Sequence, residues 1–367
     1  MFRVALSRIA GQSSGRSFRP VLPFSVFKYP TGEWGRETRN RRQGRLPDRR
    51  ITDHMSQGPL PMPAAKSLSP RVLIELLALG CIWGGSFAAN RLALDEVGVF
   101  SVVAFRVAGG MLVLWIYIRA RGFVVPRGAR IWAAFMVLGL LNNVVPFSLI
   151  VWGQRHIDSG LASIINASTA IFGVALAALV FRDEPLTGRR ILGVGLGFCG
   201  VVTAIGYGAL AQIDITSLAQ LAVLGSSLSY ACAGAFGRAM LRGVAPQVTA
   251  AAMLSCSSLV MVPLALATDG WPPLDYAAPT WAALAYLALM SAALAYLLYY
   301  RVLAQAGAGN VTLVTLVVAP IATLLGALQF GEALPPRAYG GFALLALGLA
   351  VIDGRLIRLK RADKPAG

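Results

Sequence analysis

One charged side chain, that of Arg106, lies deep inside an apolar stretch of this 367-residue chain. Burying a guanidinium at such a depth in a membrane is costly, and intramembrane charges are commonly functional. Two interpretations stay open for Arg106. Its guanidinium could anchor an anionic or carboxylate group of a bound molecule, or it could donate hydrogen bonds to carbonyls of a neighbouring helix.

Uncharged polar and aromatic residues inside the apolar stretches could line a cavity with Arg106. Polar groups at membrane depth need partners, so we expect them to face the interior of a helix bundle. Some of them would only join helices, and the aromatic rings could equally serve packing or the interfacial belt. Asn143, Asn310 and Thr312 share this polar character. The predicted binding residues are Trp83, Arg106, Asn142, Asn166, Tyr230 and Tyr296.

Three carboxylates lie near the ends of apolar stretches. Glu75 could take up a coupling proton if burial raised its pKa, or it could pair with Arg71 one helical turn away. Glu184 and Glu332 directly precede apolar stretches. A carboxylate at such a joint can cap free N–H groups and meet the positive end of a helix, so we expect structural roles for both.

The sequence does not support enzyme chemistry. It has no glycine-rich Walker loop for ATP, and His156 is the one histidine of the apolar part. A multi-histidine metal site is thereby excluded, and a serine–histidine pair has no support. The four cysteines show neither disulfide nor metal spacing. We therefore expect no catalytic residues, no metal and no cofactor.

The elements that position these residues are apolar segments separated by short polar joints. Hydrophobic residues make up 56% of the chain and charged residues 13%, about half the charge of a soluble domain. From Arg71 onward, each apolar run is long enough for a helix that crosses a hydrocarbon core of about 30 Å. The sequence predicts an all-α membrane protein with ten spans: 72–90, 100–118, 131–152, 160–181, 190–206, 217–240, 247–267, 280–300, 308–330 and 338–356.

Residues 1–70 differ in composition from the rest, being rich in Arg, Ser, Pro and Gly. Such a segment is typical of a disordered basic tail, and it lacks the apolar core of a secretory signal. An organelle transit peptide is an alternative, as is a mis-assigned start with translation beginning at Met55 or Met62. We expect this tail to leave the fold unaffected.

The net charge of +17 is distributed in a way that favours membrane orientation over nucleic-acid binding. If the N-terminus is cytoplasmic, the outside joints hold only Arg91, Arg155 and Arg337. The positive-inside rule then places both termini in the cytoplasm. The inside joints and the C-terminal tail hold fifteen basic residues: Arg119, Arg121, Arg127, Arg130, Arg182, Arg189, Arg190, Arg238, Arg242, Arg301, Arg355, Arg358, Lys360, Arg361 and Lys364.

The chain matches itself when it is shifted by 148 residues. This register aligns Glu184 with Glu332, Arg189 with Arg337, Gly193 with Gly341, and Gly200 with Gly348. Spans four and five therefore correspond to spans nine and ten, and each half contains five spans. Because five is odd, the two halves have opposite orientations, which is a transporter architecture with its site near the midplane.

These features together resemble the drug/metabolite transporter superfamily, specifically its ten-span members with two EamA domains. Span one carries Trp83-Gly84-Gly85-Ser86-Phe87, and span two carries Phe105-Arg106. Pro320 precedes Phe330-Gly331-Glu332, and Phe181-Arg182-Asp183-Glu184 ends span four. One departure is that span four has Ile171 or Phe172, rather than proline, opposite Pro320, which puts close pseudo-symmetry around the site in doubt.

The resemblance implies a secondary active transporter, often an exporter of amino acids, other metabolites or drugs, working by alternating access. It implies a small-molecule substrate, contact with membrane lipid, a coupling proton and a bacterial inner-membrane location. We assign residues 71–207 and 215–357 to the two repeats and 358–367 to a cytoplasmic tail. A passive lipid- or protein-interacting membrane subunit and an intramembrane enzyme are the alternatives. The oligomeric state, the substrate and the transport direction are not predicted.

Overall fold

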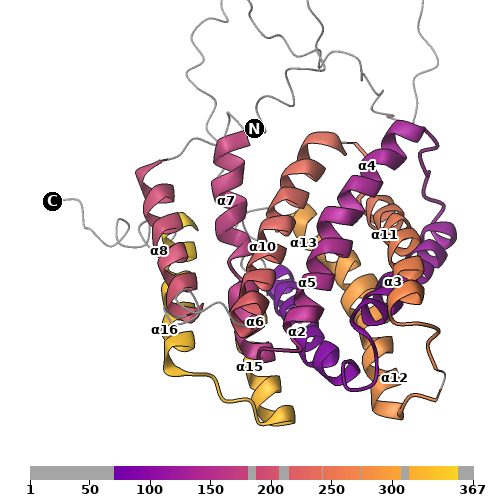
Figure 1. The fold of residues 1–367 in the computed structure, drawn as a ribbon. Helices are drawn as coiled ribbons and strands as arrows, with labels where there is room; N and C mark the ends of the chain where they lie inside the picture. The colour runs from indigo at the N-terminus through magenta and orange to yellow at the C-terminus, as the bar shows by residue number, and fades with distance from the viewer. Residues whose placement is uncertain are drawn as a thin grey trace, which may run out of the picture. The chain divides into compact units, whose positions relative to one another are not determined.

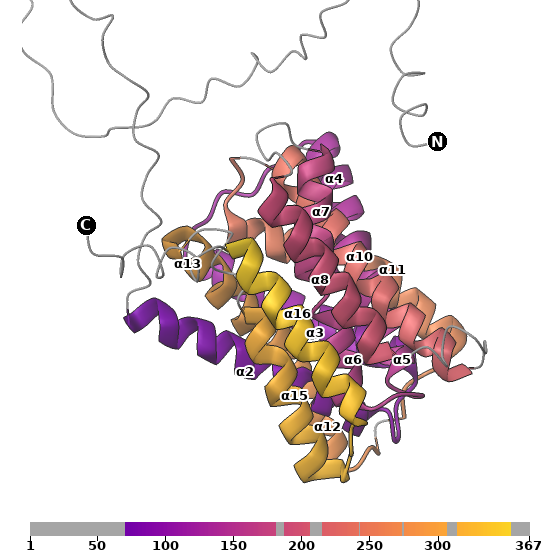
Figure 2. The same cartoon turned by 90° about the vertical axis from the view of Figure 1, so that its left-hand side faces the viewer.

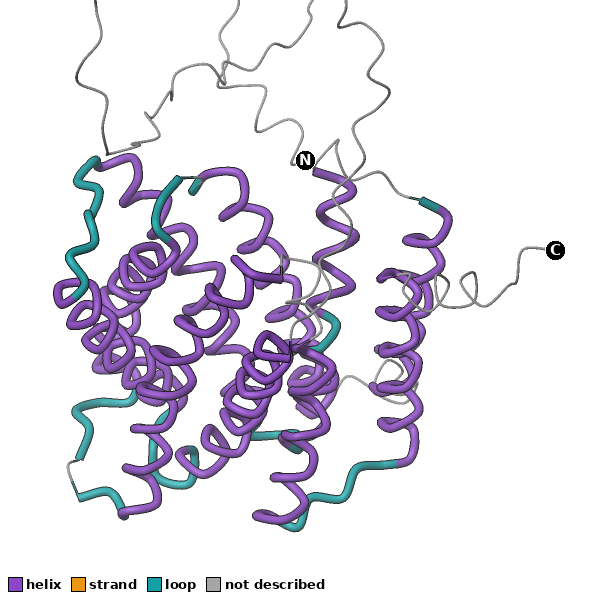
Figure 3. The backbone as a smooth tube through the Cα atoms, turned by 180° about the vertical axis from the view of Figure 1, so that it is seen from behind, coloured by secondary structure: helices purple, strands orange, loops and turns teal. Residues whose placement is uncertain are grey.

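The computed structural model describes residues 70–180, 187–205, 215–241, 243–273, 275–306 and 314–353. These residues form helices and joints, without any strand among them (Figure 3). The predicted tail, except for Pro70, lies outside the described residues, as do Glu184, Asn310, Thr312 and the C-terminal tail. The prediction of an all-α membrane protein is confirmed.

The first half of the described chain contains five helical rods near the predicted spans. Two of them are interrupted, because the third contains a π-helical turn and the fourth a break. In chain order the helices are α2 (Pro70–Ala93), α3 (Val99–Ala120), α4 (Ala129–Gly139), η1 (Leu140–Val144), α5 (Val145–Gly153), α6 (Ser159–Asn166), α7 (Thr169–Val180) and α8 (Gly188–Ile205).

The second half repeats this pattern, with a π-helical segment in its third rod. Its helices are α10 (Ile215–Met240), α11 (Pro246–Thr268), α12 (Ala278–Ala285), η2 (Tyr286–Leu294), α13 (Ala295–Ala306), α15 (Val314–Phe330) and α16 (Pro336–Asp353). Within the described ranges, seven rods are long and apolar enough to cross a membrane, and the fifth, ninth and tenth are shorter apolar helices. Ten crossings therefore remain a prediction.

Helices of the two halves are interleaved. The first-half helix α2 packs along α15 and also touches α12 and α13 of the second half, while α3 packs along α11 (Figures 1 and 2). The core is divided between two clusters of buried apolar side chains, one centred on α3 and α11, the other on α2, α6 and α15. The sequence repeat is thus not a pair of separate folding units.

The glycines matched by the 148-residue shift form the contact between α8 and α16, which lie side by side (Figure 2). A Cβ atom on Gly193 would lie 2.7 Å from the carbonyl oxygen of Gly348, and one on Gly348 would lie 2.6 Å from that of Gly193. Gly200 and Gly341 form the same reciprocal pair, at 2.7 and 2.6 Å. Gly193 thus contacts the repeat-mate of Gly200, and Gly200 contacts the repeat-mate of Gly193, which is the relation that a two-fold axis requires. The packing therefore supports the inverted repeat.

The π-helical segments occupy corresponding places in spans three and eight. Adding 148 to the bounds of η1, Leu140–Val144, gives 288–292, which lies inside η2, Tyr286–Leu294. In span three, Pro146 lies two residues after η1 and cannot donate the regular helical hydrogen bond. Single π turns are rare in proteins, and many of them lie at functional sites. Both segments contribute polar residues to the centre of the bundle.

Candidate functional site

Arg106 is buried on α3, with 6% of its surface exposed. Its Nη2 donates a hydrogen bond to the Ser291 hydroxyl of η2 at 2.8 Å. The guanidinium carbon lies 3.8 Å from the ring centroid of Phe147 on α5, which is a cation–π contact. The buried Nε has no hydrogen-bond partner among the residues that the structure describes. Among the described residues, no helix carbonyl accepts a hydrogen bond from Arg106, so its structural role stays an alternative to be tested.

Arg106 has no carboxylate partner among the described residues. The ion pairs between those residues join Arg71 and Arg301 to Glu75, and Arg91 to Asp95. Among the described residues, the hydroxyls of three tyrosines, Tyr230, Tyr286 and Tyr296, lie near the Arg106 guanidinium. A buried charge without a counter-ion is energetically costly unless something pairs with it. The surroundings of Arg106 can therefore accept an anion.

Asn142 and Tyr296 meet in a polar network beside Arg106. The Asn142 amide donates to the Tyr296 hydroxyl at 2.8 Å, and that hydroxyl donates to Asn143 Oδ1 at 2.9 Å. Asn143 in turn donates to the Ser257 hydroxyl on α11 at 2.9 Å. The network joins η1 of the first half to α11 and α13 of the second. Two predicted binding residues, Asn142 and Tyr296, thus use their polar groups for hydrogen bonds between helices.

Trp83 and Tyr230 each contact a residue that also contacts Arg106. Trp83 Nε1 donates to the Ser291 carbonyl at 3.3 Å, so Ser291 contacts both Trp83 and Arg106. The Tyr230 ring of α10 lies 6.3 Å, centroid to centroid, from Phe147, on which the Arg106 guanidinium is stacked. Five of the six predicted binding residues are thereby brought together: Trp83, Arg106, Asn142, Tyr230 and Tyr296.

Asn166 lies apart from this cluster, at the end of α6. Its Oδ1 lies 3.5 Å from the Ser226 hydroxyl of α10, which donates to the Val223 carbonyl at 2.6 Å. In the described part of the chain Asn166 has no hydrogen bond to Arg106. Tyr230 follows Ser226 by four positions, so the two share one face of α10. Asn166 is therefore connected to the cluster along α10 and remains a candidate at its margin.

The carboxylates have partners that the sequence did not predict. Glu75 pairs with Arg71 at 3.5 Å, as one alternative expected, and also with Arg301 at 2.7 Å. Glu332 does cap a helix, since its Oε2 accepts from the Gly160 N–H at 3.2 Å. That N–H belongs to α6 of the other half rather than to the following helix α16, because tertiary packing places the two far-apart segments together.

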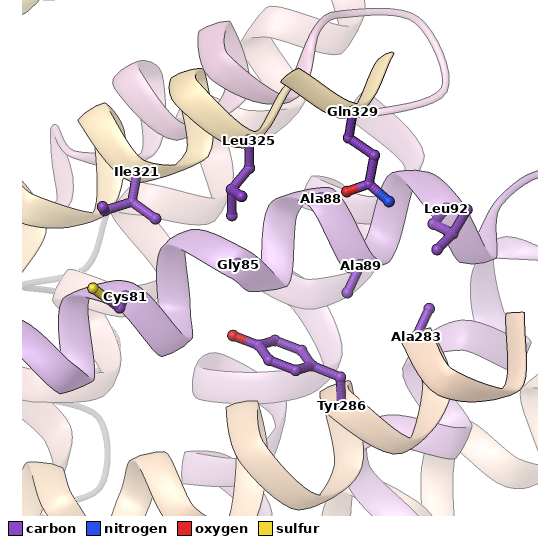
Figure 4. Close-up of a pocket in the computed structure, with 10 residues that line it drawn as sticks. All are labelled: Cys81, Gly85, Ala88, Ala89, Leu92, Ala283, Tyr286, Ile321, Leu325 and Gln329. Carbon is purple, nitrogen blue, oxygen red and sulfur yellow. The ribbon is translucent and has the colours of Figure 1, made fainter. Parts of the chain in front are cut away.

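A cavity of about 430 Å³ lies between α2, α15 and the α12–η2 rod (Figure 4). It contains none of the predicted binding residues. Tyr286 forms one wall, and its hydroxyl donates to the Ile82 carbonyl at 2.9 Å. Tyr286 belongs to η2, the segment that also carries Ser291, the hydrogen-bond partner of Arg106. Its lining is mostly apolar: Cys81, Gly85, Ala88, Ala89, Leu92, Ala283, Tyr286, Ile321, Leu325 and Gln329.

Sequence reasoning missed three residues that surround Arg106: Phe147, Tyr286 and Ser291. One signal could have found Ser291, because the 148-residue shift places it opposite Asn143. No sequence feature distinguishes Phe147 and Tyr286 from the other aromatic residues of the chain. Within the described residues no group of three or more His, Cys, Asp or Glu side chains gathers as a metal site.

The fold and the site define a class of protein: an integral membrane helix bundle with a tandem repeat and a buried cation at the contact between the halves. The EamA-like transporter family model matches residues 71–206 and again 217–353. The chain therefore belongs to the EamA-like transporter family and is a membrane transporter. The resemblance to the drug/metabolite transporter superfamily is confirmed.

Curated relatives carry transporter names or names that state no activity. Protein PagO of Salmonella typhimurium is 28% identical over 35% of this chain and 41% of its own length. An uncharacterized transporter of Archaeoglobus fulgidus is 27% identical over 52% of this chain and 66% of its own. A probable terminal-alkyne amino-acid exporter of Streptantibioticus cattleyicolor is 26% identical over 78% of this chain and 94% of its own.

A protein of known crystal structure has the same fold. It superposes with a TM-score of 0.58 at 20% identity, covering 80% of this chain and 99% of its own. At this identity the likeness concerns the fold alone. The matched family and the relatives' names indicate a transporter rather than an enzyme, and a transporter implies a small-molecule substrate.

Proposed function

We propose that this chain is a secondary active transporter that exports small carboxylate-bearing metabolites, amino acids or related compounds, by alternating access. The observation that carries the proposal is the buried Arg106 guanidinium, which has one hydrogen bond, a free Nε and no carboxylate partner among the described residues. A substrate carboxylate would supply the missing counter-ion in a charge-assisted hydrogen bond. Phe147, Tyr230 and Tyr296 would surround its apolar part. Drug-like anions with an apolar part would be bound by the same residues.

The remaining parts of the proposal rest on family and sequence. The bacterial relatives support a bacterial inner-membrane location, and the distribution of basic residues supports cytoplasmic termini. The name of the Streptantibioticus relative supports export of an amino-acid-like compound. Proton exchange as the driving force rests on the resemblance. Glu75 is the carboxylate that would take up the coupling proton. Alternating access is supported by the repeat, since halves of this kind rock around a shared midplane site.

The proposal is tested by counterflow in liposomes that contain the purified full chain. Three matched probes separate the charges: L-phenylalanine, 3-phenylpropanoate and phenethylamine. We expect saturable counterflow of the two carboxylates and none of phenethylamine. A lipid-binding subunit or an intramembrane enzyme would give no counterflow, and transport of phenethylamine alone would contradict the role of Arg106.

Substitutions of Arg106 then test the anchor itself. Arg106→Ala is expected to abolish carboxylate counterflow while the detergent-solubilised protein keeps its melting temperature or gains a little, because the desolvation cost of the charge is removed. Arg106→Lys should retain transport with a weaker apparent affinity, since a point charge replaces the planar fork. A stable Ala variant that transports normally would remove Arg106 from the site. Lost activity explained by a lower melting temperature would make Arg106 structural.

A further inference from the structure

The cavity of about 430 Å³ has three sides, with α2 as its floor and α15 and the α12–η2 rod as its walls. Ile321, Leu325 and Gln329 point from α15 toward α2, and Tyr286 reaches α2 from the opposite wall (Figure 4). The three α15 residues are spaced by four and so share one helical face. The floor is one face of α2, made mostly of small residues: Cys81, Gly85, Ala88, Ala89 and Leu92.

The cavity opens to the outside of the helix bundle. Two of its lining residues, Cys81 and Gln329, are exposed. Beside its wall on α15, Leu324 is 54% exposed and Leu328 is 76% exposed. Exposed apolar side chains of this kind mark a surface that contacts another apolar phase, which for a membrane protein is lipid. A lipid chain could therefore enter the cavity directly from the bilayer.

The position and length of the cavity match one leaflet of a membrane. Helix α2 runs from Pro70 to Ala93, so that Cys81 lies about halfway along it and Leu92 lies at its end. The eleven residues from Cys81 to Leu92 rise about 16 Å. Half of a hydrocarbon core of about 30 Å is about 15 Å. The cavity thus extends from the membrane interface to the midplane, which is the path of an acyl chain.

Polar groups gather at the interfacial end of the cavity, near Leu92. The Gln329 side chain points toward α2 there (Figure 4). The Arg91 guanidinium of α2 lies 5.9 Å from the Phe330 ring centroid, at the end of α15. Its ion pair with Asp95, at 3.0 Å, is exposed, and exposed pairs are weak. A basic side chain at the interface attracts anionic lipid headgroups, so this end suits a phosphate and the rest suits a hydrocarbon chain.

We propose that this cavity is a binding site for one acyl chain of a phospholipid. The headgroup phosphate lies at Arg91 and Gln329, and the chain runs along α2 with its end near Cys81. The inference goes beyond the proposed function and does not depend on it. Because α2 belongs to the first half and α15 and α12 to the second, the bound chain touches both halves. It is enclosed on three sides, unlike a lipid that merely covers an exposed helix face.

The test is photo-crosslinking of the full chain in phosphatidylglycerol nanodiscs. Two probes are compared: phosphatidylglycerol with a diazirine at the end of one acyl chain, and phosphatidylglycerol with a diazirine next to the ester of that chain. Peptide mass spectrometry locates the attachment. We expect the chain-end probe to label the protein around Cys81 and Tyr286, and the ester-end probe to label it around Leu92 and Gln329.

Leu325→Trp fills the cavity and should reduce chain-end labelling around Cys81 at least fivefold. Leu324→Trp is the matched control, because it places the same side chain on the neighbouring residue, which is exposed and does not line the cavity. Labelling in this control should equal that of the wild-type chain. Cys81→Phe, at the exposed deep end, is a second filling variant if Leu325→Trp does not fold, with labelling then measured at Tyr286.

Three results would overturn the site. The label could be spread evenly over exposed apolar residues such as Leu328, it could be equally strong in Leu325→Trp and Leu324→Trp, or the two probes could label the same depth. Loss of the label in excess 3-phenylpropanoate would also overturn it, because the cavity would then belong to the substrate. Labelling requires no transport, so a wild-type chain without counterflow contradicts the proposed function and leaves this test intact.

Discussion

At the scale of single residues, the centre of this bundle separates polar groups that are satisfied within the protein from those that are not. Asn142, Asn143 and Tyr296 bond to one another, with Asn143 passing the network to Ser257. Arg106 has a free Nε and no carboxylate partner among the described residues. A substrate would have to displace existing hydrogen bonds to bind the Asn142, Asn143 and Tyr296 side chains. At Arg106 it would instead supply the missing hydrogen-bond acceptor and counter-ion.

Asp158, in the joint before α6, gives a residue-scale prediction about pH. Its pKa is raised by partial burial and then by the neighbouring Glu332, and lowered by Arg91. The folded protein therefore binds this proton more tightly than the unfolded chain, whose aspartates titrate near about 3.9. The free energy of unfolding falls as the pH rises through the window between these two pKa values.

Asp158→Asn should accordingly raise the melting temperature at neutral pH, since it removes a charge that partial burial and Glu332 disfavour, and the Asp158 side chain makes no capping hydrogen bond to α6 that would be lost. The advantage should shrink as the pH is lowered toward the ordinary range of a carboxyl group. Melting curves of both proteins in one detergent, from neutral to acidic pH, measure this. A variant that is less stable at neutral pH would show that the Asp158 charge stabilises the fold.

At the scale of elements, the interrupted helices and the glycine-lined pair α8 and α16 are the features that set the architecture. The π segments η1 and η2 carry Asn143 and Ser291 at positions related by the repeat. Each directs its polar group to a neighbouring helix of the other half, Asn143 to Ser257 on α11 and Ser291 to Arg106 on α3. The two contacts occupy corresponding places in the two halves, but the Asn143–Ser257 contact is neutral and the Ser291–Arg106 contact contains a charged guanidinium.

Gly200 gives the element-scale prediction. A Cβ atom there would lie 2.7 Å from the Gly341 carbonyl oxygen and 2.7 Å from the Leu345 nitrogen. Both atoms are backbone and cannot move aside cheaply. Gly200→Ala should force α8 and α16 apart and destabilise the protein by about 1–3 kcal/mol, seen as a lower melting temperature.

Gly195→Ala on the same helix is the matched control, because among the described residues no atom outside the local backbone of α8 lies within 4 Å of its added Cβ. Alanine there should leave the melting temperature unchanged or slightly higher, given its better helix propensity. Equal melting temperatures for the two variants would show that the close glycine contact is not needed.

At the scale of the whole molecule, the two halves are tied together at several places by polar contacts that cross between them. Asp269 accepts from the Ser101 N–H at the start of α3, and Glu96 accepts from the Ala277 N–H before α12. Glu75 pairs with Arg301 across the same division. Any rocking of one half against the other would have to rearrange contacts of this kind.

Membrane orientation is the prediction that belongs to this scale. Fifteen basic residues flank the spans on the proposed cytoplasmic side against three on the other. A reporter that is active only in the cytoplasm should therefore work when fused after Lys364 and be silent when fused near Gly208. The reverse pattern would invert the molecule and contradict the positive-inside argument.

The sequence by itself determined the all-α membrane class of the protein, and it predicted which segments form helices and how the halves correspond. A membrane admits a narrow range of span lengths, so apolar runs and basic joints mark the spans with little ambiguity. The matches of Gly193 and Gly200 to Gly341 and Gly348 predicted a repeat, and the reciprocal packing of those glycines supports it. Arg106 was also identifiable, because a charge inside an apolar run stands out without reference to its neighbours.

Only the tertiary structure decided what these residues touch. Arg106 meets Ser291, 185 positions away, and Glu75 meets Arg301, 226 positions away. The rotation and tilt of each helix fix such pairs, and composition does not encode either. The break in span four contains no proline, and the hydroxyls of Thr169 and Ser227 bond to the Asn166 carbonyl there. Local patterns report which solvent a segment prefers, whereas a binding site depends on which side chains of distant segments come to lie together.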